Sequence, residues 1–108
     1  MNDAAALGIF ACLSNPTRLQ ILKTLVAAGP DGLIAGTIAQ KIAASPSRAS
    51  FHLSRMAEAG LLTAHRQARE ITYAVDFSAM GALMRFLLQD CCADNPVVRA
   101  CCVDAKAC

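Results

Sequence analysis

The sequence predicts a mainly α-helical domain that carries one small β-hairpin, and three observations lead to this fold class. Apolar residues recur at helical spacing through most of the chain. Alanine, the residue with the highest helix propensity, occupies 22 of the 108 positions. Only the stretch at residues 71–75 alternates clearly as a strand does. With 56% hydrophobic and 17% charged residues, the chain is expected to form one globular domain and not a disordered one.

Two helices are expected in the first thirty residues. The first covers Asp3 to Leu13. Asn15 then supplies an N-cap, and Pro16 suits the first helical position because its missing N–H needs no partner there. The second helix ends at the "GPDG" turn. The stripes expected to face the core are Ala6, Leu7, Phe10 and Leu13 in the first helix and Leu19, Leu22, Leu25 and Val26 in the second.

The next segment predicts two short helices joined by a tight turn, which is a helix-turn-helix pattern. The first covers Thr37 to Ala43. Ser45 caps the second, Pro46 opens it, and Gly60 ends it. Ile38 and Ile42 are expected to face inward, as are Ala49, Leu53, Met56 and Ala57. The opposite, outer face of the second helix is expected to hold Ser47, Arg48, Ser50, His52 and Arg55.

A hairpin follows this pair of helices. Residues 62–65 can pair with residues 71–75 across the tip "RQAR", which carries Arg66 and Arg69. The order of helices, helix-turn-helix, hairpin and final helix is the winged helix-turn-helix arrangement.

The final helix is expected to start at a Ser78 cap and to run into Cys91 and Cys92. Pro96 disfavours its continuation. We therefore divide the chain into a winged helix-turn-helix domain at residues 1–90 and a cysteine-rich C-terminal segment at residues 91–108.

Positive charge gathers in the middle of the chain, although the net charge is only +2. Five basic residues lie between Lys41 and Arg69, against the single acid Glu58. Such a local excess is typical of a surface that contacts a phosphate backbone, and it is also compatible with a solvated helix face. The predicted DNA-binding residues are Ser47, Arg48, Ser50, His52 and Arg55 on the second short helix and Arg66 and Arg69 on the hairpin tip.

The segments "LSNPTRLQILKTL", "TIAQKIAASPSRASFHLSRMAEAGLL" and "ITYAVD" together resemble the ArsR/SmtB family of small bacterial repressors. The resemblance covers roughly Leu7 to Leu88, and "SPSRASFHLSRMAEAGL" is its most diagnostic part. It implies a homodimer built from the first and last helices that binds double-stranded operator DNA, represses transcription and senses metalloids. The chain departs from the family at its hairpin tip, where "QARE" has no glycine. That departure leaves the placement of Arg66 and Arg69 open.

The cysteines of the C-terminal segment indicate which kind of inducer the protein would bind. Two sites known in the family are absent: the start of the reading helix, "ASPSRAS", has no cysteine, and the last helix has no histidine. The paired cysteines of the C-terminal segment remain. Thiolates select soft acceptors, and trivalent arsenic or antimony takes three of them. The predicted ligands are Cys91 and Cys92 with either Cys101 or Cys102 as the third.

The other cysteines have different expected roles. Cys12, in the first helix, is expected to be a small packing residue, and Cys108 to be mobile at the terminus. A redox switch or another soft-metal sensor is the main alternative for the C-terminal thiols, and zinc is disfavoured because the C-x₂₋₄-C spacing is missing.

Two other classes of function remain as alternatives to a repressor. One is a metalloid-binding chaperone without DNA affinity, and the other is an enzyme that uses a cysteine with His52 or His65. The enzyme is disfavoured because no third, orienting residue is evident. No basic leader and no apolar run of about 20 residues are present, so a cytoplasmic protein without a membrane partner and without an organic cofactor is expected.

Overall fold

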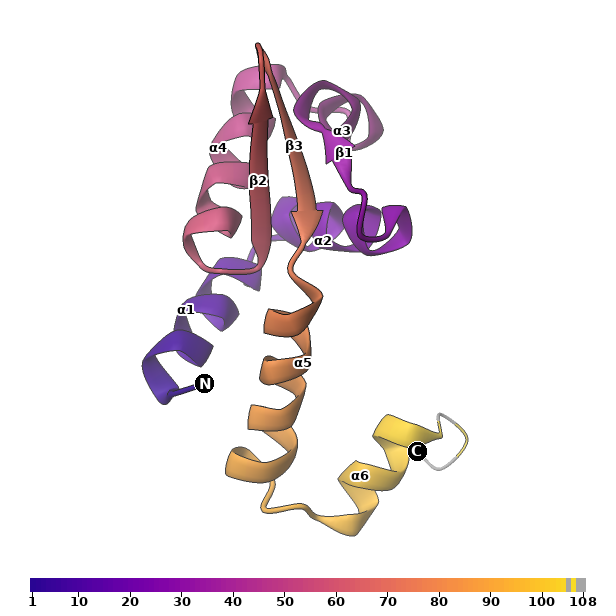
Figure 1. The fold of residues 1–108 in the computed structure, drawn as a ribbon. Helices are drawn as coiled ribbons and strands as arrows, with labels where there is room; N and C mark the ends of the chain where they lie inside the picture. The colour runs from indigo at the N-terminus through magenta and orange to yellow at the C-terminus, as the bar shows by residue number, and fades with distance from the viewer. Residues whose placement is uncertain (105, 107–108) are drawn as a thin grey trace.

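The computed structural model describes residues 1–104 and 106 and has the predicted fold class (Figure 1). It is mostly helical, with a small antiparallel sheet of three strands in the order β1-β3-β2. The elements are α1 (Asp3–Leu13), α2 (Pro16–Ala28), β1 (Leu33–Ile34), α3 (Ala35–Lys41), α4 (Pro46–Glu58), β2 (Leu62–Gln67), β3 (Glu70–Val75), α5 (Phe77–Arg85), the π-helix η1 (Phe86–Cys91) and α6 (Pro96–Val103).

Side-chain caps fix the starts of several helices, as the sequence predicted for two of them. Asn15 accepts a hydrogen bond from the Arg18 N–H at 3.1 Å, and Ser45 accepts one from the Arg48 N–H at 3.2 Å. The predicted Ser78 cap is wrong. Asp76 caps α5 instead, because its carboxylate accepts from the Ala79 N–H at 3.0 Å and the helix therefore starts two residues earlier than a Ser78 cap would allow.

The core lies between α2, α3, α4 and the sheet. Its largest fully buried side chains are Ile9, Ile21, Leu25, Ile38, Leu53, Met56 and Leu61. Ile38 and Ile42 face inward as predicted, and so do Ala49, Leu53 and Met56, whereas Ala57 is only half-buried.

The predicted inner face of α1 is partly wrong. Leu7 is 63% exposed and Phe10 is 37% exposed, whereas Ile9 and Cys12 are buried. Leu19 and Val26 of α2 are likewise exposed, and Ile21 takes their place in the core. The reason is that α1 is apolar on all sides, so its sequence periodicity could not select the face that packs.

The hairpin registers Leu62 with Val75 and Gln67 with Glu70, which leaves a two-residue turn. The tip is therefore tight although it lacks glycine, and Ala68 accommodates it with a left-handed φ of 56°. The strand β1 was not predicted, because two residues carry no periodicity. It pairs Leu33 with Tyr73 at the free edge of β3.

The turn of the helix-turn-helix also uses a left-handed alanine. Ala43 has a φ of 53°, and the Ala44 N–H donates back to the Ala39 carbonyl at 3.0 Å. This closes the end of α3 in the manner usual for a glycine and directs the chain into α4.

Beyond α5 the chain differs most from expectation. The helix widens into η1 and ends at Cys91, and Pro96, predicted only to stop a helix, begins another, α6. Ala93 and Asp94 between them are both left-handed, with φ values of 48° and 55°. In Figure 1, α6 stands apart from α1 and the sheet. None of the helices among residues 1–104 is both long and apolar enough to span a bilayer.

Candidate DNA-reading helix and C-terminal thiols

The outer face of α4 is polar and exposed. Ser47, Arg48, Ser50 and Arg55 all lie on the solvent side, as predicted. Arg48 donates to the Thr17 hydroxyl at the start of α2, at 3.1 Å, and Arg55 approaches Glu58 at 3.8 Å. Both guanidinium groups are therefore held near the surface of α4, where they can contact phosphates or base edges.

The predicted position of His52 on this outer face is wrong. Its side chain is buried, with 8% exposure, and its Nδ1 lies 3.2 Å from Nη1 of Arg18. Because Arg18 has no acceptor, Nδ1 accepts this hydrogen bond and is unprotonated. Burial, followed by the positive charges of Arg18 and Arg48, lowers the pKa of His52. The neutral His52 ring thus anchors α4 to Arg18 on the buried side of the helix.

Arg18 is the functional residue that the sequence analysis missed. Its Nε donates to the Cys12 carbonyl at 2.6 Å while Nη1 reaches His52, so one side chain joins the end of α1 to the middle of α4. No local pattern signals this role, since 34 residues separate Arg18 from His52.

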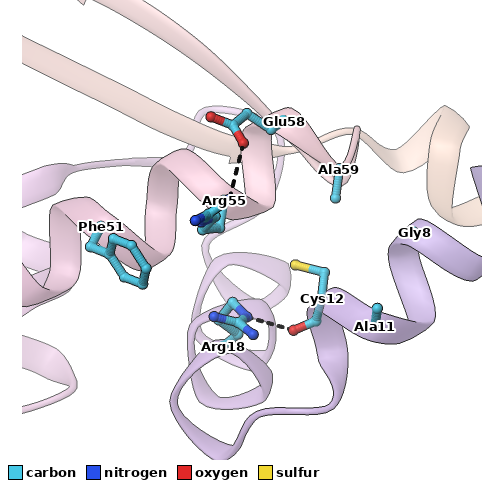
Figure 2. Close-up of a pocket in the computed structure, with 8 residues that line it drawn as sticks. All are labelled: Gly8, Ala11, Cys12, Arg18, Phe51, Arg55, Glu58 and Ala59. Atoms are coloured by element: carbon cyan, nitrogen blue, oxygen red, sulfur yellow. Dashed lines mark hydrogen bonds and ion pairs between the residues drawn. The ribbon is translucent and has the colours of Figure 1, made fainter.

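An open cavity of about 560 Å³ lies between α1 and α4, and Arg18 and Cys12 are among its lining residues. Figure 2 shows the side chains that line it. Phe51 lies on its α4 side with the Arg55 guanidinium 5.3 Å from the ring centre. Cys12 lies on its α1 side and is buried, which confirms its predicted packing role. Burial raises the pKa of the Cys12 thiol, although the Arg18 charge opposes that shift, so this sulfur favours the unreactive thiol form.

The hairpin tip presents the remaining predicted cations. Arg66 lies on β2 and Arg69 in the two-residue turn, and both are exposed. The tight turn therefore places two positive charges at the end of the wing, as a contact with phosphates or an adjacent minor groove requires.

The four predicted metal ligands fall into two separate groups. Cys91 is exposed at the end of η1 and Cys92 follows it, half-buried, whereas Cys101 and Cys102 lie on α6. Cys91, Cys92 and Cys102 carry free thiols. Across residues 1–104 and 106, no three Cys, His, Asp or Glu side chains are grouped to hold a metal ion. Cys108 lies outside the described residues. The donor chemistry suits a soft trivalent acceptor, but the cysteines within the described part of one chain do not gather three sulfurs at one point.

Comparison with known proteins places the chain in a family. Residues 13–65 match the model of a helix-turn-helix domain. The HTH-type transcriptional regulator YgaV of Escherichia coli is 34% identical over 82 residues, which cover 76% of this chain and 81% of that protein. The nodulation protein NolR of Rhizobium meliloti is 33% identical over 100 residues, covering 87% of this chain and 80% of that protein.

Solved structures agree with these relatives. An ArsR-like transcriptional regulator from Rhodococcus sp. RHA1 superposes with a TM-score of 0.72 at 26% identity, covering 90% of this chain and 89% of that one. The chain belongs to the ArsR family. Another similar structure is described as a possible transcriptional regulator for arsenical resistance. It has a TM-score of 0.61 and 27% identity, and covers 68% of this chain and 74% of that one.

Membership in the ArsR family gives the α3–α4 pair its role as the DNA-binding unit of a transcriptional regulator. YgaV and the Rhodococcus protein are both described as transcriptional regulators. Of the two histidines that the enzyme alternative could use, His52 is buried against Arg18, whereas His65 is exposed on β2.

Proposed function

We propose that this ArsR-family protein is a homodimeric repressor that binds operator DNA and releases it on binding trivalent arsenic or antimony through its C-terminal thiolates. The observation that carries the proposal is the pairing of an exposed, basic reading helix with three free thiols at and beyond the end of η1. The similarity to a structure described in connection with arsenical resistance supports the choice of inducer.

The DNA contacts follow from the exposed side chains. Ser47, Arg48 and Ser50 lie in the N-terminal half of α4, the part of a reading helix that enters the major groove. Arg55, Arg66 and Arg69 supply phosphate contacts, which set affinity and salt dependence more than sequence preference. His52 acts through its bond to Arg18, by fixing the orientation of α4.

The dimer uses the apolar surface that α1 and η1 leave open. A cavity of about 290 Å³ between them is lined by Leu7, Phe10 and Phe86. Leu7 and Phe10 are exposed in the single chain, and burial of about 100 Å² of apolar surface contributes roughly 2.5 kcal/mol. A second copy that covers this surface sets two α4 helices at the spacing of successive major grooves, about 34–36 Å.

The inducer acts at the end of the same helix. Cys91 is both the last residue of η1 and part of this cavity lining, so a ligand on its sulfur lies at the proposed dimer contact. A trivalent metalloid supplies a soft acceptor for three thiolates. A 100-fold loss of operator affinity requires a coupling free energy of only about 3 kcal/mol.

The test measures operator binding with and without arsenite. We expect the wild-type protein to bind its promoter duplex and arsenite to weaken that binding, whereas Cys91→Ser with Cys92→Ser should stay bound in arsenite. Cys12→Ala is the matched control, because that thiol is buried away from the segment, and it should respond as the wild type does. Arsenite release from the double variant would disprove the thiol site, and an absence of specific duplex binding by the wild type would disprove the repressor.

The same thiols support a second candidate, redox sensing, because Cys91 and Cys102 are free and exposed. A redox repressor would release DNA on treatment with hydrogen peroxide and not with arsenite under reducing conditions. Running both treatments on the same variants separates the two functions.

A further inference from the structure

A phenylalanine lies in the middle of the polar face of α4. Phe51 is 54% exposed, and Ser47 and Arg55 lie four residues before and after it, which places all three on one face of the helix. The face that packs into the core holds Ala49, Leu53 and Met56. Single exposed apolar side chains are common on protein surfaces, so exposure alone does not mark a site. What distinguishes Phe51 is its place among the side chains proposed to contact DNA.

Two neighbouring groups hold the Phe51 ring. The Arg55 guanidinium lies 5.3 Å from the ring centre, and the His52 ring meets it edge to face with 5.5 Å between centroids. His52 is buried and hydrogen-bonded to Arg18, so it is a fixed support. A side chain that is already held in place loses little conformational entropy when it binds, which favours a specific contact.

The surroundings of the Phe51 ring leave it accessible to a partner. Ser47 and Ser54, one turn away on either side, are short and exposed. The cavity that Phe51 borders is open, and the side chain remains more than half exposed there. In Figure 2, Phe51 and Arg55 project from the same side of α4. The ring is therefore an accessible apolar group among hydroxyl and guanidinium groups.

The major groove of DNA offers one apolar group that such a ring can recognise. Thymine carries a C5 methyl there, whereas cytosine presents an amino donor, and guanine and adenine present polar edges. The phenylalanine ring has no conventional donor or acceptor, so packing it on a polar edge leaves that edge without a partner. A thymine methyl loses no hydrogen bond in the same contact and gains burial.

We propose that Phe51 is a specificity-determining residue of the reading helix, which packs on the C5 methyl of one thymine in each half of the operator. The inference rests on the proposed function, since it names a base that the proposed repressor recognises. Arg55, one turn further along α4, is placed to contact a phosphate beside that base. Phe51 thus supplies sequence preference, whereas the arginines supply affinity.

Uracil substitution tests the contact, because uracil differs from thymine only by the missing C5 methyl and keeps the base pair and every phosphate. The probe is a duplex that the wild-type protein selects from a random-sequence pool, in which deoxyuridine then replaces each thymine in turn. Burial of one methyl is worth about fourfold in affinity, so we expect one thymine in each half-site at which the wild type loses about fourfold. Phe51→Ala should bind the thymine duplex more weakly and show no further loss with uracil at that position.

Phe77→Ala is the matched control. Phe77 is the same residue type and is 44% exposed, but it lies at the start of α5 and not on α4. We expect this variant to keep the wild-type loss with uracil at the same thymine. The slope of log affinity against log salt should be unchanged in Phe51→Ala, because the variant loses no phosphate contact, whereas a displaced α4 would alter that slope.

The outcomes separate this inference from the proposed function. If no thymine shows an effect of its methyl group, or if Phe51→Ala retains that effect, Phe51 does not read thymine and the proposed repressor stands. If Phe77→Ala loses the effect as Phe51→Ala does, or if the salt slope of Phe51→Ala changes, the effect does not come from a direct contact of Phe51. If the wild type selects no sequence from the pool, both the inference and the proposed function are wrong.

Discussion

Replacing Arg18 with methionine removes the side chain that joins α1 to the reading helix. Methionine keeps an unbranched apolar stem but has no donor to offer. The Cys12 carbonyl loses the Nε donor at 2.6 Å, and Nδ1 of the buried His52 loses its partner at 3.2 Å. We expect Arg18→Met to reduce the free energy of unfolding and to loosen α4 at the same time.

The magnitude follows from the two bonds. Hydrogen bonds that involve a charged group are each worth roughly 1.5–3 kcal/mol, and Arg18 is only half-buried, so we expect a loss of about 2–3 kcal/mol in all. Arg55→Met is the control. Arg55 borders the same cavity, but its pair with Glu58 is 3.8 Å long between side chains that are 59% and 71% exposed, so its loss should cost about 0–1 kcal/mol.

Urea denaturation at one fixed protein concentration measures both variants, since the stability of the proposed dimer would depend on concentration. The midpoint should fall clearly for Arg18→Met and little for Arg55→Met, with the slope m unchanged. Operator binding well below the unfolding range should also weaken for Arg18→Met, because α4 is no longer held from within. If Arg18→Met unfolds no more easily than Arg55→Met, the inference that Arg18 links α1 to α4 is wrong.

Three further predictions concern pH, backbone fit and DNA contact. The pKa of His52 is lowered in the folded state, so as the pH falls the unfolded state takes up a proton near pH 6.5 before the folded state does. The free energy of unfolding should therefore be at its full value above about pH 6.5 and decrease as the pH drops below that. Urea titrations at a series of pH values check this, and His52→Gln should flatten the pH dependence of the free energy of unfolding. Gly32→Ala places a Cβ 2.1 Å from the Tyr73 carbonyl at a φ of 69° and should cost about 3–5 kcal/mol. Gly60→Ala, at a φ of 86° but in open space, should cost only about 1–2 kcal/mol, and equal losses in thermal melts would refute the clash. Arg66→Gln should lower the slope of log affinity against log salt by about 1 for each subunit without altering sequence preference, and an unchanged slope means that Arg66 contacts no phosphate.

Local chemistry let the sequence predict most of the winged helix-turn-helix domain. Asn15 and Ser45 cap their helices by accepting a hydrogen bond from a backbone N–H only three residues away. Because this contact is local, the sequence pattern was enough to predict it. The alternation of residues 71–75 likewise gave the inner strand of the hairpin. The exposed arginines of α4 and the hairpin tip could be named because charged side chains away from an apolar stripe face solvent, although the polar His52 on the same helix does not.

Tertiary packing decided the rest. The sequence of α1 is apolar on every side, so only its contact with α2 and α4 selected Ile9 and Cys12 for the core and left Leu7 and Phe10 on the surface. His52 faces inward because Arg18, distant in sequence, offers a donor for its ring. The positions of the C-terminal thiols depend on a turn of two left-handed residues that no periodicity marks. Helix capping and strand alternation depend on residues a few positions apart, so the sequence predicts them. The choice between two equally apolar helix faces depends on contacts with residues distant in sequence, which come close only in the folded chain.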